Sequence, residues 1–388
     1  MRRWRRDRWA RPGAALLAAG FLLALGACRS RPRPSPPGAP PSPEEVAARR
    51  FAHIPKIDYH AHIIRPDALD RALALGRPWG IVHYVNLSPS TRPGVVEAYV
   101  VAARLAGGRM SVFVNPPWKE TQNGPGYGTR MAAALAAAQA EGARGLKISK
   151  GLGLGFVGAR RELLPVDAPE LDALFEKAGE LGLPVSIHTG DPKAFWQPIT
   201  PANERFDELR VHPDWSNHGE PVPSWETLLA QLERRVARHP RTRFVGVHFG
   251  NAPEEPARVA AMLDQHPNYF IDTAARIPEI GRHDPAEMRR FFVKYQDRVL
   301  FGTDLGIGVD EEDLMLGSTG AEPPTKEERR RFYEATWRYF ETDDRDFEHP
   351  TPIQGRWRIN GINLPPGVLE KIYHRNAERL LRIPEVKW

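Results

Sequence analysis

The sequence predicts an α/β protein of the (β/α)₈ barrel class, in which eight parallel strands alternate with helices. Three observations support this class: eight short apolar runs rich in β-branched or aromatic residues, helical segments between many of them, and a folded length of about 300 residues. An open, doubly wound sheet is the alternative. It is disfavoured because no G-x-G-x-x-G motif follows the first candidate strand.

The candidate strands are short, and most are followed by polar residues or by a Gly/Pro cluster. They are residues 57–60, 80–85, 110–114, 145–148, 184–188, 243–248, 269–272 and 298–302. Helical periodicity and stop signals predict helices between several of them, at Arg130–Gln139, Ala168–Leu181, Ser224–Arg238, Glu254–Leu263 and Pro285–Tyr295. This alternation predicts one parallel sheet that closes on itself.

The N-terminus has the features of an export signal. Residues 1–27 contain six arginines and one acidic residue, and the apolar run Ala14 to Ala27 is too short to span a bilayer as a mature helix. The sequence Leu25-Gly26-Ala27-Cys28 resembles the bacterial lipobox, in which the cysteine is lipidated and becomes the new N-terminus. We therefore expect residues 1–27 to be a lipoprotein signal peptide and Cys28 to carry the lipid. The alternative is an ordinary signal peptide with an incidental cysteine.

The rest of the chain divides into a tether and one domain. Residues 28–50 are predicted to hold the lipidated cysteine and a tether, with seven prolines between positions 29 and 44. Residues 51–388 are predicted to form the barrel, and a start of the folded domain near Glu45 is the alternative. Removal of residues 1–27 lowers the net charge from +6 to +1, which gives no electrostatic reason to bind nucleic acid. Since Arg29 rather than Asp follows Cys28, the lipobox resemblance favours an anchor at the periplasmic face of the outer membrane or elsewhere in the cell envelope.

Histidine and aspartate residues occur where the predicted strands end. His60 and His62 close the first strand and, at positions i and i+2, share one face; His188, His248 and Asp304 follow the fifth, sixth and eighth strands. Barrel enzymes place their active sites at these carboxyl ends. Imidazole and carboxylate groups suit a divalent metal, so the pattern predicts a metal site, with Zn²⁺ favoured and Mn²⁺, Fe²⁺ and Co²⁺ as alternatives.

Five segments carry a resemblance to the amidohydrolase superfamily. They are residues 57–62, 186–189, 246–251, 301–304 and the closing stretch 372–381. Over roughly residues 51–384 the sequence is most similar to the amidohydrolase-related branch that includes aminocarboxymuconate-semialdehyde decarboxylase. The resemblance implies that His60, His62, His188 and Asp304 bind one metal. It also implies that His248 hydrogen-bonds the metal-bound water or the substrate, and that Asp304 takes the proton of that water. By analogy we expect a homodimer.

Lys147 departs from the mononuclear pattern of that branch. It closes the fourth strand, where binuclear amidohydrolases place a carboxylated lysine between two metals. We favour a free ammonium group that meets an anionic substrate group or a carboxylate. The alternative is a carbamate bridge in a binuclear site, with His248 then binding the second metal.

These residues leave three functions open for an exported protein acting on a small molecule. A metal-bound water with a pKa near 7 could attack an amide, ester or lactone carbonyl, with His248 suited to proton transfer; this metal-dependent hydrolase is our first hypothesis. The second is a non-oxidative decarboxylase, in which Arg276 or Lys147 holds the substrate carboxylate. The third is a non-catalytic binding lipoprotein, which is disfavoured because no predicted metal ligand is lost.

Two long insertions are expected to shape the pocket, since βα loops carry specificity in this fold. One runs from His188 to Trp225, and the other spans Glu341–Pro366. Within the first, Trp196 is the candidate substrate contact, with packing under the loop as the alternative. Three residues at the ends of strands two and three could also line the pocket and donate hydrogen bonds, namely Tyr84, Asn86 and Asn115.

Overall fold

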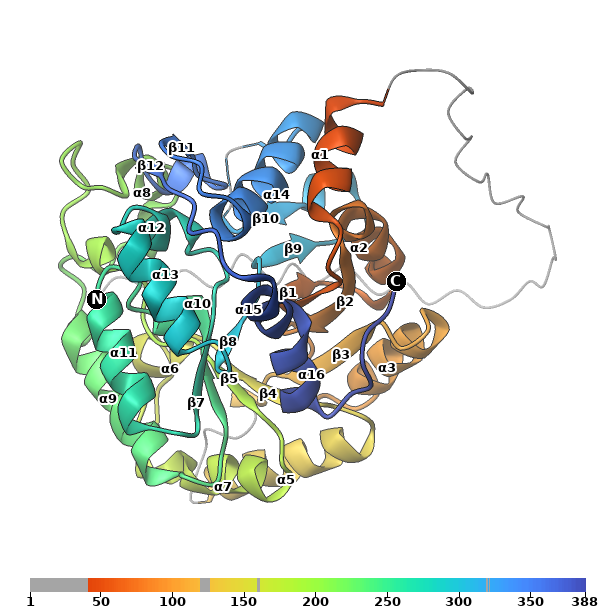
Figure 1. Cartoon of the computed structure of the whole chain (residues 1–388). Coiled ribbons are helices and arrows are strands. Elements are labelled where there is room, and N and C mark those ends of the chain that lie inside the picture. The colour runs from red at the N-terminus through yellow and green to blue at the C-terminus, as the bar shows by residue number, and fades with distance from the viewer. Residues whose placement is uncertain (1–40, 119–125, 159–160, 319, 321) are drawn as a thin grey trace, which may run out of the picture. The chain divides into compact units, whose positions relative to one another are not determined.

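The computed structural model describes residues 41–118, 126–158, 161–318, 320 and 322–388. These residues form one domain in which a curled, mainly parallel sheet is surrounded by helices (Figure 1). The (β/α)₈ barrel predicted from the sequence is confirmed. The signal peptide, Cys28 and the proline-rich stretch up to residue 40 lie outside the described residues.

Eight strands pair in chain order, each parallel to the next. They are β1 (Lys56–Ile63), β2 (Ile81–Asn86), β3 (Met110–Val114), β4 (Gly145–Ile148), β5 (Val185–Ile187), β6 (Phe244–Gly246), β7 (Tyr269–Asp272) and β8 (Val299–Leu300). All eight overlap the predicted ranges. Nearly every strand residue is buried, because helices cover the outside of the sheet and side chains fill its interior.

The segment after β8 closes the barrel against β1. The Tyr59 amide donates to the Phe301 carbonyl at 2.9 Å, and the Asp304 amide donates to the His60 carbonyl at 2.8 Å. Strand β9 (Leu305–Ile307) then runs parallel to β1, and β10 (Met315–Leu316) adds an antiparallel edge. These bonds place Asp304 directly beside the end of β1.

Helices follow most of the strands (Figure 1). The long ones are α2 (Leu69–Gly76), α3 (Val95–Leu105), α5 (Tyr127–Ala140), α7 (Asp172–Glu180), α9 (Trp225–Arg238), α11 (Pro256–Gln265), α13 (Pro285–Lys294) and α14 (Lys326–Glu341). Shorter ones are α6 (Gly151–Leu154), α8 (Phe206–Val211), α10 (Val247–Gly250), α12 (Ile277–Gly281), α15 (Pro366–Glu370) and α16 (Asn376–Leu381). The five predicted helices are present, with ends shifted by a few residues.

A helix precedes the first strand of the barrel. Helix α1 (Pro43–Phe51) lies where the boundary at residue 51 put the end of the tether, and it agrees with the alternative start near Glu45. Ser42 and Glu45 form a capping box, and a proline in the first turn suits a helix start. Phe51 is buried, and α1 packs against α14. None of the helices in the described part of the chain is long and apolar enough to cross a membrane.

The second predicted insertion forms a hairpin that packs beside α12. It consists of β11 (Phe347–Glu348) and β12 (Arg358–Ile359), joined through a short 3₁₀ helix, Pro352–Gln354. The Asn360 amide donates to the Gly281 carbonyl, and Gln354 Nε2 donates to the Gly317 carbonyl just after β10. The hairpin therefore reaches the end of the barrel where strand eight ends, next to α8 and α12 (Figure 1).

Lys56 is buried at the opposite end of β1. Its ammonium donates to the carbonyls of Phe51 at 2.7 Å and Ile54 at 3.0 Å, and lies 3.9 Å from Glu341 Oε1. Burial lowers the pKa of Lys56 to about 8, although Glu341 opposes this shift. The charged form is therefore less favourable in the folded protein than in the unfolded chain.

Lys56→Met is expected to change how stability depends on pH. Between about pH 8 and 10.5 the unfolded chain binds more protons than the folded one, so Lys56 makes stability rise with pH, by up to about 1.4 kcal/mol per unit. Urea unfolding at pH 7 to 10 should show this slope in the wild type and in the exposed control Lys177→Met, and a smaller slope in Lys56→Met. Equal slopes in all three proteins would contradict the assignment.

Candidate metal centre

His60, His62 and Asp304 meet at the carboxyl end of β1, as the sequence predicted. Asp304 lies in the turn between β8 and β9, in the left-handed conformation with φ of +63°. Its Oδ1 atom is 3.3 Å from His60 Nε2 and 3.4 Å from His62 Nε2. His60 is completely buried, whereas the His62 side chain is 27% exposed, so His62 marks the side from which the site is accessible.

His248 and His188 complete the group. The His248 ring centroid lies 4.8 Å from that of His60 and 4.4 Å from that of His188. His248 follows β6 with φ of +57°, and Phe249 is also left-handed. Such conformations cost about 1–3 kcal/mol in non-glycine residues and cluster at functional sites. The backbone after β6 is therefore held in an unusual form that brings His248 over the barrel axis.

Hydrogen bonds fix the tautomers of two histidines. His60 Nδ1 lies 2.9 Å from a carboxylate oxygen of Asp272, and His248 Nδ1 lies 2.9 Å from the Ala274 carbonyl oxygen. Both Nδ1 atoms must donate, because their partners can only accept. Burial lowers the pKa of both histidines well below the ordinary value, which keeps the rings neutral. Each ring therefore presents an unprotonated Nε2 atom.

These donors fit a divalent metal. His60, His248 and Asp304 each offer a ligand atom, and these atoms lie within 4.8 Å of one another. The Nε2 atoms of His60 and His188 are buried and make no hydrogen bond within the described residues. Neutral imidazoles whose second nitrogen is hydrogen-bonded to a carboxylate or carbonyl are typical metal ligands. The family resemblance implied a hydrogen-bonding role for His248, with a ligand role only in a binuclear site, but the geometry groups its ring with the candidate ligand atoms.

The electrostatics keep Asp304 ionised. Burial alone would raise the pKa of its carboxyl group, but the interactions with the imidazoles of His60, His62 and His248 bring it below the usual range. Asp304 is therefore the one ionised carboxylate among the candidate ligand atoms. This combination suits Zn²⁺ or a similar ion.

Lys147 lies with the group, at the end of β4. It is 3% exposed, and its Nζ atom has no hydrogen-bond partner within the ranges that the structure describes. Burial lowers its pKa to about 8, opposed by Asp272 and Asp304. The structure therefore brings Lys147 to the predicted position, and both the free amine and the carbamate remain compatible with it.

Arg276 lies next to the same group, at the start of α12. It is 7% exposed, and Nη1 donates to the Ala275 carbonyl at 2.8 Å. No carboxylate of the described residues lies within 4.0 Å of its guanidinium. After burial, the charge of Arg276 is the largest influence that lowers the pKa of His248. This buried cation is therefore available for an anionic group of a ligand.

Three other predicted pocket residues have structural roles. The Tyr84 hydroxyl is buried and donates to the Ala72 carbonyl on α2, and Asn115 Nδ2 donates to the carbonyls of Leu87 and Pro89. The donors of these two side chains hold the sheet to α2 and to the loop after β2, and their contact with a substrate stays a prediction. Trp196 is half-buried, donates to the Pro223 carbonyl and packs on the core, which is the alternative we had left open.

Sequence reasoning missed the residues that hold the ligands. Asp272, the last residue of β7, accepts hydrogen bonds from His60 Nδ1, the His248 amide and the Ala274 amide. Asp58 accepts from the hydroxyl of Thr303 at 2.6 Å and so ties β1 to strand eight. Burial raises the pKa of Asp272 to about 6 and that of Asp58 to about 7. The position of Asp272 at a strand end was a signal that could have identified it.

Comparison with known proteins identifies the family. The family model described as amidohydrolase matches residues 37–383. This chain belongs to the amidohydrolase family. The family is metal-dependent, which agrees with the donor set of this amidohydrolase. A comparison with curated protein sequences gives no match.

Several solved structures are similar to this chain at low sequence identity. A Staphylococcus aureus protein provisionally described as an amidohydrolase is 12% identical, with 85% of this chain and 100% of that chain covered and a TM-score of 0.50. A 2,6-dihydroxybenzoate decarboxylase from Rhizobium is 15% identical, covering 85% and 99%, with a TM-score of 0.47. A dihydroxybenzoic acid decarboxylase from Polaromonas, solved with manganese and 2-nitroresorcinol, is 13% identical, covering 85% and 97%, with a TM-score of 0.49.

Proposed function

We propose that this amidohydrolase uses one divalent metal ion to hydrolyse an amide, ester or lactone bond of a small molecule. One observation carries the proposal: the unprotonated Nε2 atoms of His60 and His248 lie beside the ionised Asp304, each with its Nδ1 proton committed elsewhere. Zn²⁺ is favoured, while Mn²⁺, Fe²⁺ and Co²⁺ suit the same donors. A binding lipoprotein without catalysis would have no need for this arrangement.

The protein residues divide into ligands and proton acceptors. His60, His248 and Asp304 would hold the ion, with His62 and His188 beside them. A bound ion would polarise the substrate carbonyl and lower the pKa of a bound water from 15.7 to about 7. Because the Nε2 lone pair of His248 would bind the ion, we assign proton acceptance to the Asp304 carboxylate rather than to His248.

Non-oxidative decarboxylation is the second candidate, and Arg276 favours it. The buried guanidinium of Arg276 has no carboxylate partner among the described residues, so it could pair with a substrate carboxylate. The buried amino group of Lys147 is a second basic group at the same site. The two reactions are separated by assaying the metal-loaded protein on paired libraries of carboxylic acids and of their esters, amides and lactones. Release of CO₂ supports decarboxylation, release of the acid and its leaving group supports hydrolysis, and no turnover with either library contradicts both.

Arg276→Met is expected to weaken the use of anionic substrates. A charge-assisted hydrogen bond contributes about 1.5–3 kcal/mol, so kcat/KM should fall about 10- to 100-fold for a carboxylated substrate and little for its neutral ester. Arg290→Met, which changes an exposed arginine, serves as the control. An equal fall in kcat/KM for the acid and for its ester would show that Arg276 supports the fold and does not bind the substrate carboxylate.

We further propose that the protein is a lipoprotein anchored through Cys28, on the lipobox-like sequence that precedes it. Cys28→Ala is expected to move the protein from the membrane fraction to the soluble fraction and to abolish labelling with a palmitate analogue. Membrane retention rests on the acyl chains, since several chains bind a bilayer far better than one. A Cys28→Ala protein that stays in the membrane fraction would contradict the anchor.

A further inference from the structure

The hairpin of the second insertion comes close to the metal centre. A Cβ atom built on Gly317 would lie 3.3 Å from the Thr351 hydroxyl and 3.4 Å from the Thr303 carbonyl oxygen. Thr303 directly precedes Asp304, and Gln354 Nε2 donates to the Gly317 carbonyl. Residues 351–354 therefore lie beside the segment that carries Asp304.

The hairpin holds three buried polar atoms that lack a partner. Thr351 Oγ1, Gln354 Oε1 and His349 Nδ1 form no hydrogen bond with any residue that the structure describes, although all three side chains are at most 5% exposed. The amide orientation of Gln354 follows from its Nε2 bond to Gly317. His349 Nε2 lies 3.0 Å from the Gly355 carbonyl and must donate, so its Nδ1 is an acceptor. Each buried polar group without a hydrogen-bond partner lowers the free energy of unfolding by about 1–3 kcal/mol.

A buried ion-pair network lies next to these hairpin residues, on α8 and α12. Arg205 Nη1 donates to Glu208 at 2.6 Å, and Arg205 also pairs with Glu279 on α12. Ser318, next to Gly317, donates to Glu208 at 2.5 Å. Glu279 Oε2 is a further buried acceptor without a partner in the described part of the chain. The two glutamates are balanced by Arg205 and the neighbouring Arg276, so the region carries no excess charge.

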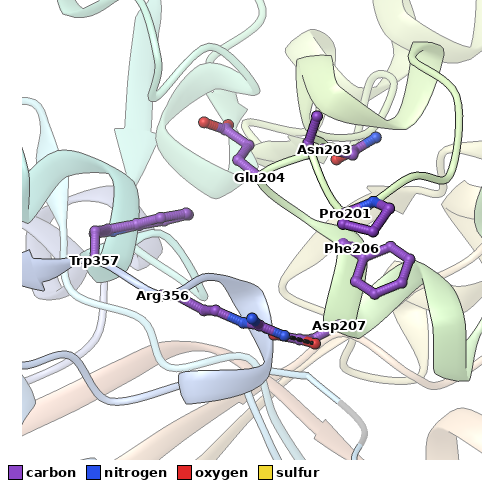
Figure 2. Close-up of a pocket in the computed structure, with 8 residues that line it drawn as sticks. Pro201, Asn203, Glu204, Phe206, Asp207, Arg356 and Trp357 are labelled. Atoms are coloured by element: carbon purple, nitrogen blue, oxygen red, sulfur yellow. Dashed lines mark hydrogen bonds and ion pairs between the residues drawn. The ribbon is translucent and has the colours of Figure 1, made fainter.

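The two insertions also meet at the outer side of this region. An ion pair between Asp207 and Arg356 joins them at 2.6 Å and borders a cavity of about 260 Å³ (Figure 2). Figure 2 shows Trp357 on one side of the cavity and Phe206 with Pro201 on the other. The Trp357 ring lies 5.5 Å from that of His349. His349 of the hairpin is therefore next to a residue that lines this cavity.

We infer that His349, Thr351, Gln354 and Glu279 form a subsite that binds a hydroxyl-bearing part of the substrate away from the metal. Three of the four free atoms can only accept hydrogen bonds, so the ligand must donate. Because the charges of the glutamates and arginines beside the hairpin balance, neutral hydroxyl groups of a ligand suit the subsite better than an ammonium group. The inference rests on the proposed function, because it assigns a subsite of the same pocket.

The first test measures binding without catalysis. D-gluconate and hexanoate both have six carbons and one carboxylate, and they differ in the hydroxyl groups. Calorimetric titration of the zinc-loaded full-length chain should show at least about tenfold tighter binding of gluconate, and Thr351→Val or Gln354→Met should bring that ratio close to one. An equal affinity for both acids in the wild type overturns the subsite. It leaves the proposed hydrolysis intact, since that is decided by the metal content and by turnover.

The second test uses stability and needs no ligand. Removing a hydroxyl that has no partner should leave Tm unchanged or raise it by about 2 °C, so we expect this of Thr351→Val. Thr242→Val is the matched control, because the buried Thr242 hydroxyl donates to the Phe175 carbonyl at 2.8 Å. Its loss should lower Tm by about 2 °C. If Thr351→Val lowers Tm as much as the control does, the hydroxyl is structural and the subsite is overturned.

Discussion

Asp304→Asn is expected to lower kcat/KM by about 10³-fold and to release the metal. The carboxylate of Asp304 is the one negative charge between His60 and His62, and an amide cannot replace it as a ligand or as a proton acceptor. The measurement is steady-state kinetics together with the metal content of the purified variant.

The control for this variant is Asp264→Asn, which changes an exposed aspartate paired with Lys294. It should retain full activity and full metal content. A purified Asp304→Asn protein with wild-type activity and wild-type metal content would contradict the proposed metal centre. A His60→Ala protein with wild-type activity and metal content would contradict it as well.

Asp272→Asn should have the second-largest effect, although Asp272 is not proposed as a ligand. Its carboxylate accepts the Nδ1 proton of His60 and the amide proton of His248. An Asn NH₂ group facing His60 Nδ1 would move the ring proton to Nε2 and remove the lone pair that binds the metal. Loss of such supporting carboxylates lowers metal affinity about 10- to 100-fold.

Competition with a zinc chelator measures this affinity, and thermal unfolding of the metal-free protein checks the fold. We expect weaker zinc binding by Asp272→Asn at a Tm close to that of the metal-free wild type. If zinc affinity does not change, Asp272 does not control the tautomer of His60.

The strands and the residues at their carboxyl ends were the features that the sequence predicted best. Strands covered on both sides must be apolar along their length, so all eight could be located from composition alone. The same logic located His60, His62, His188 and Asp304, because parallel strands bring their carboxyl ends together. These four residues lie together with His248 in the structure.

Spacing along the sequence does not give the direction in which a side chain points. Tyr84 and Asn115 lie at strand ends, but their hydrogen bonds run to Ala72 and to the loop after β2, which no spacing rule reveals. His248 lies with the other candidate ligands as expected, but its left-handed backbone could not be foreseen. The hairpin residue Thr351 lies far along the chain from the ends of the eight barrel strands, so only the fold brings it near the segment of Asp304.

The metal content of the purified protein tests the central claim most directly. Elemental analysis of the wild type after loading with Zn²⁺ and removal of excess ion should give about one metal per chain, and His60→Ala should retain almost none. Two metals per chain would instead support a carbamate on Lys147 that bridges a binuclear site. A wild-type protein that holds no metal, or a His60→Ala protein that holds as much as the wild type, would contradict the metal centre described above.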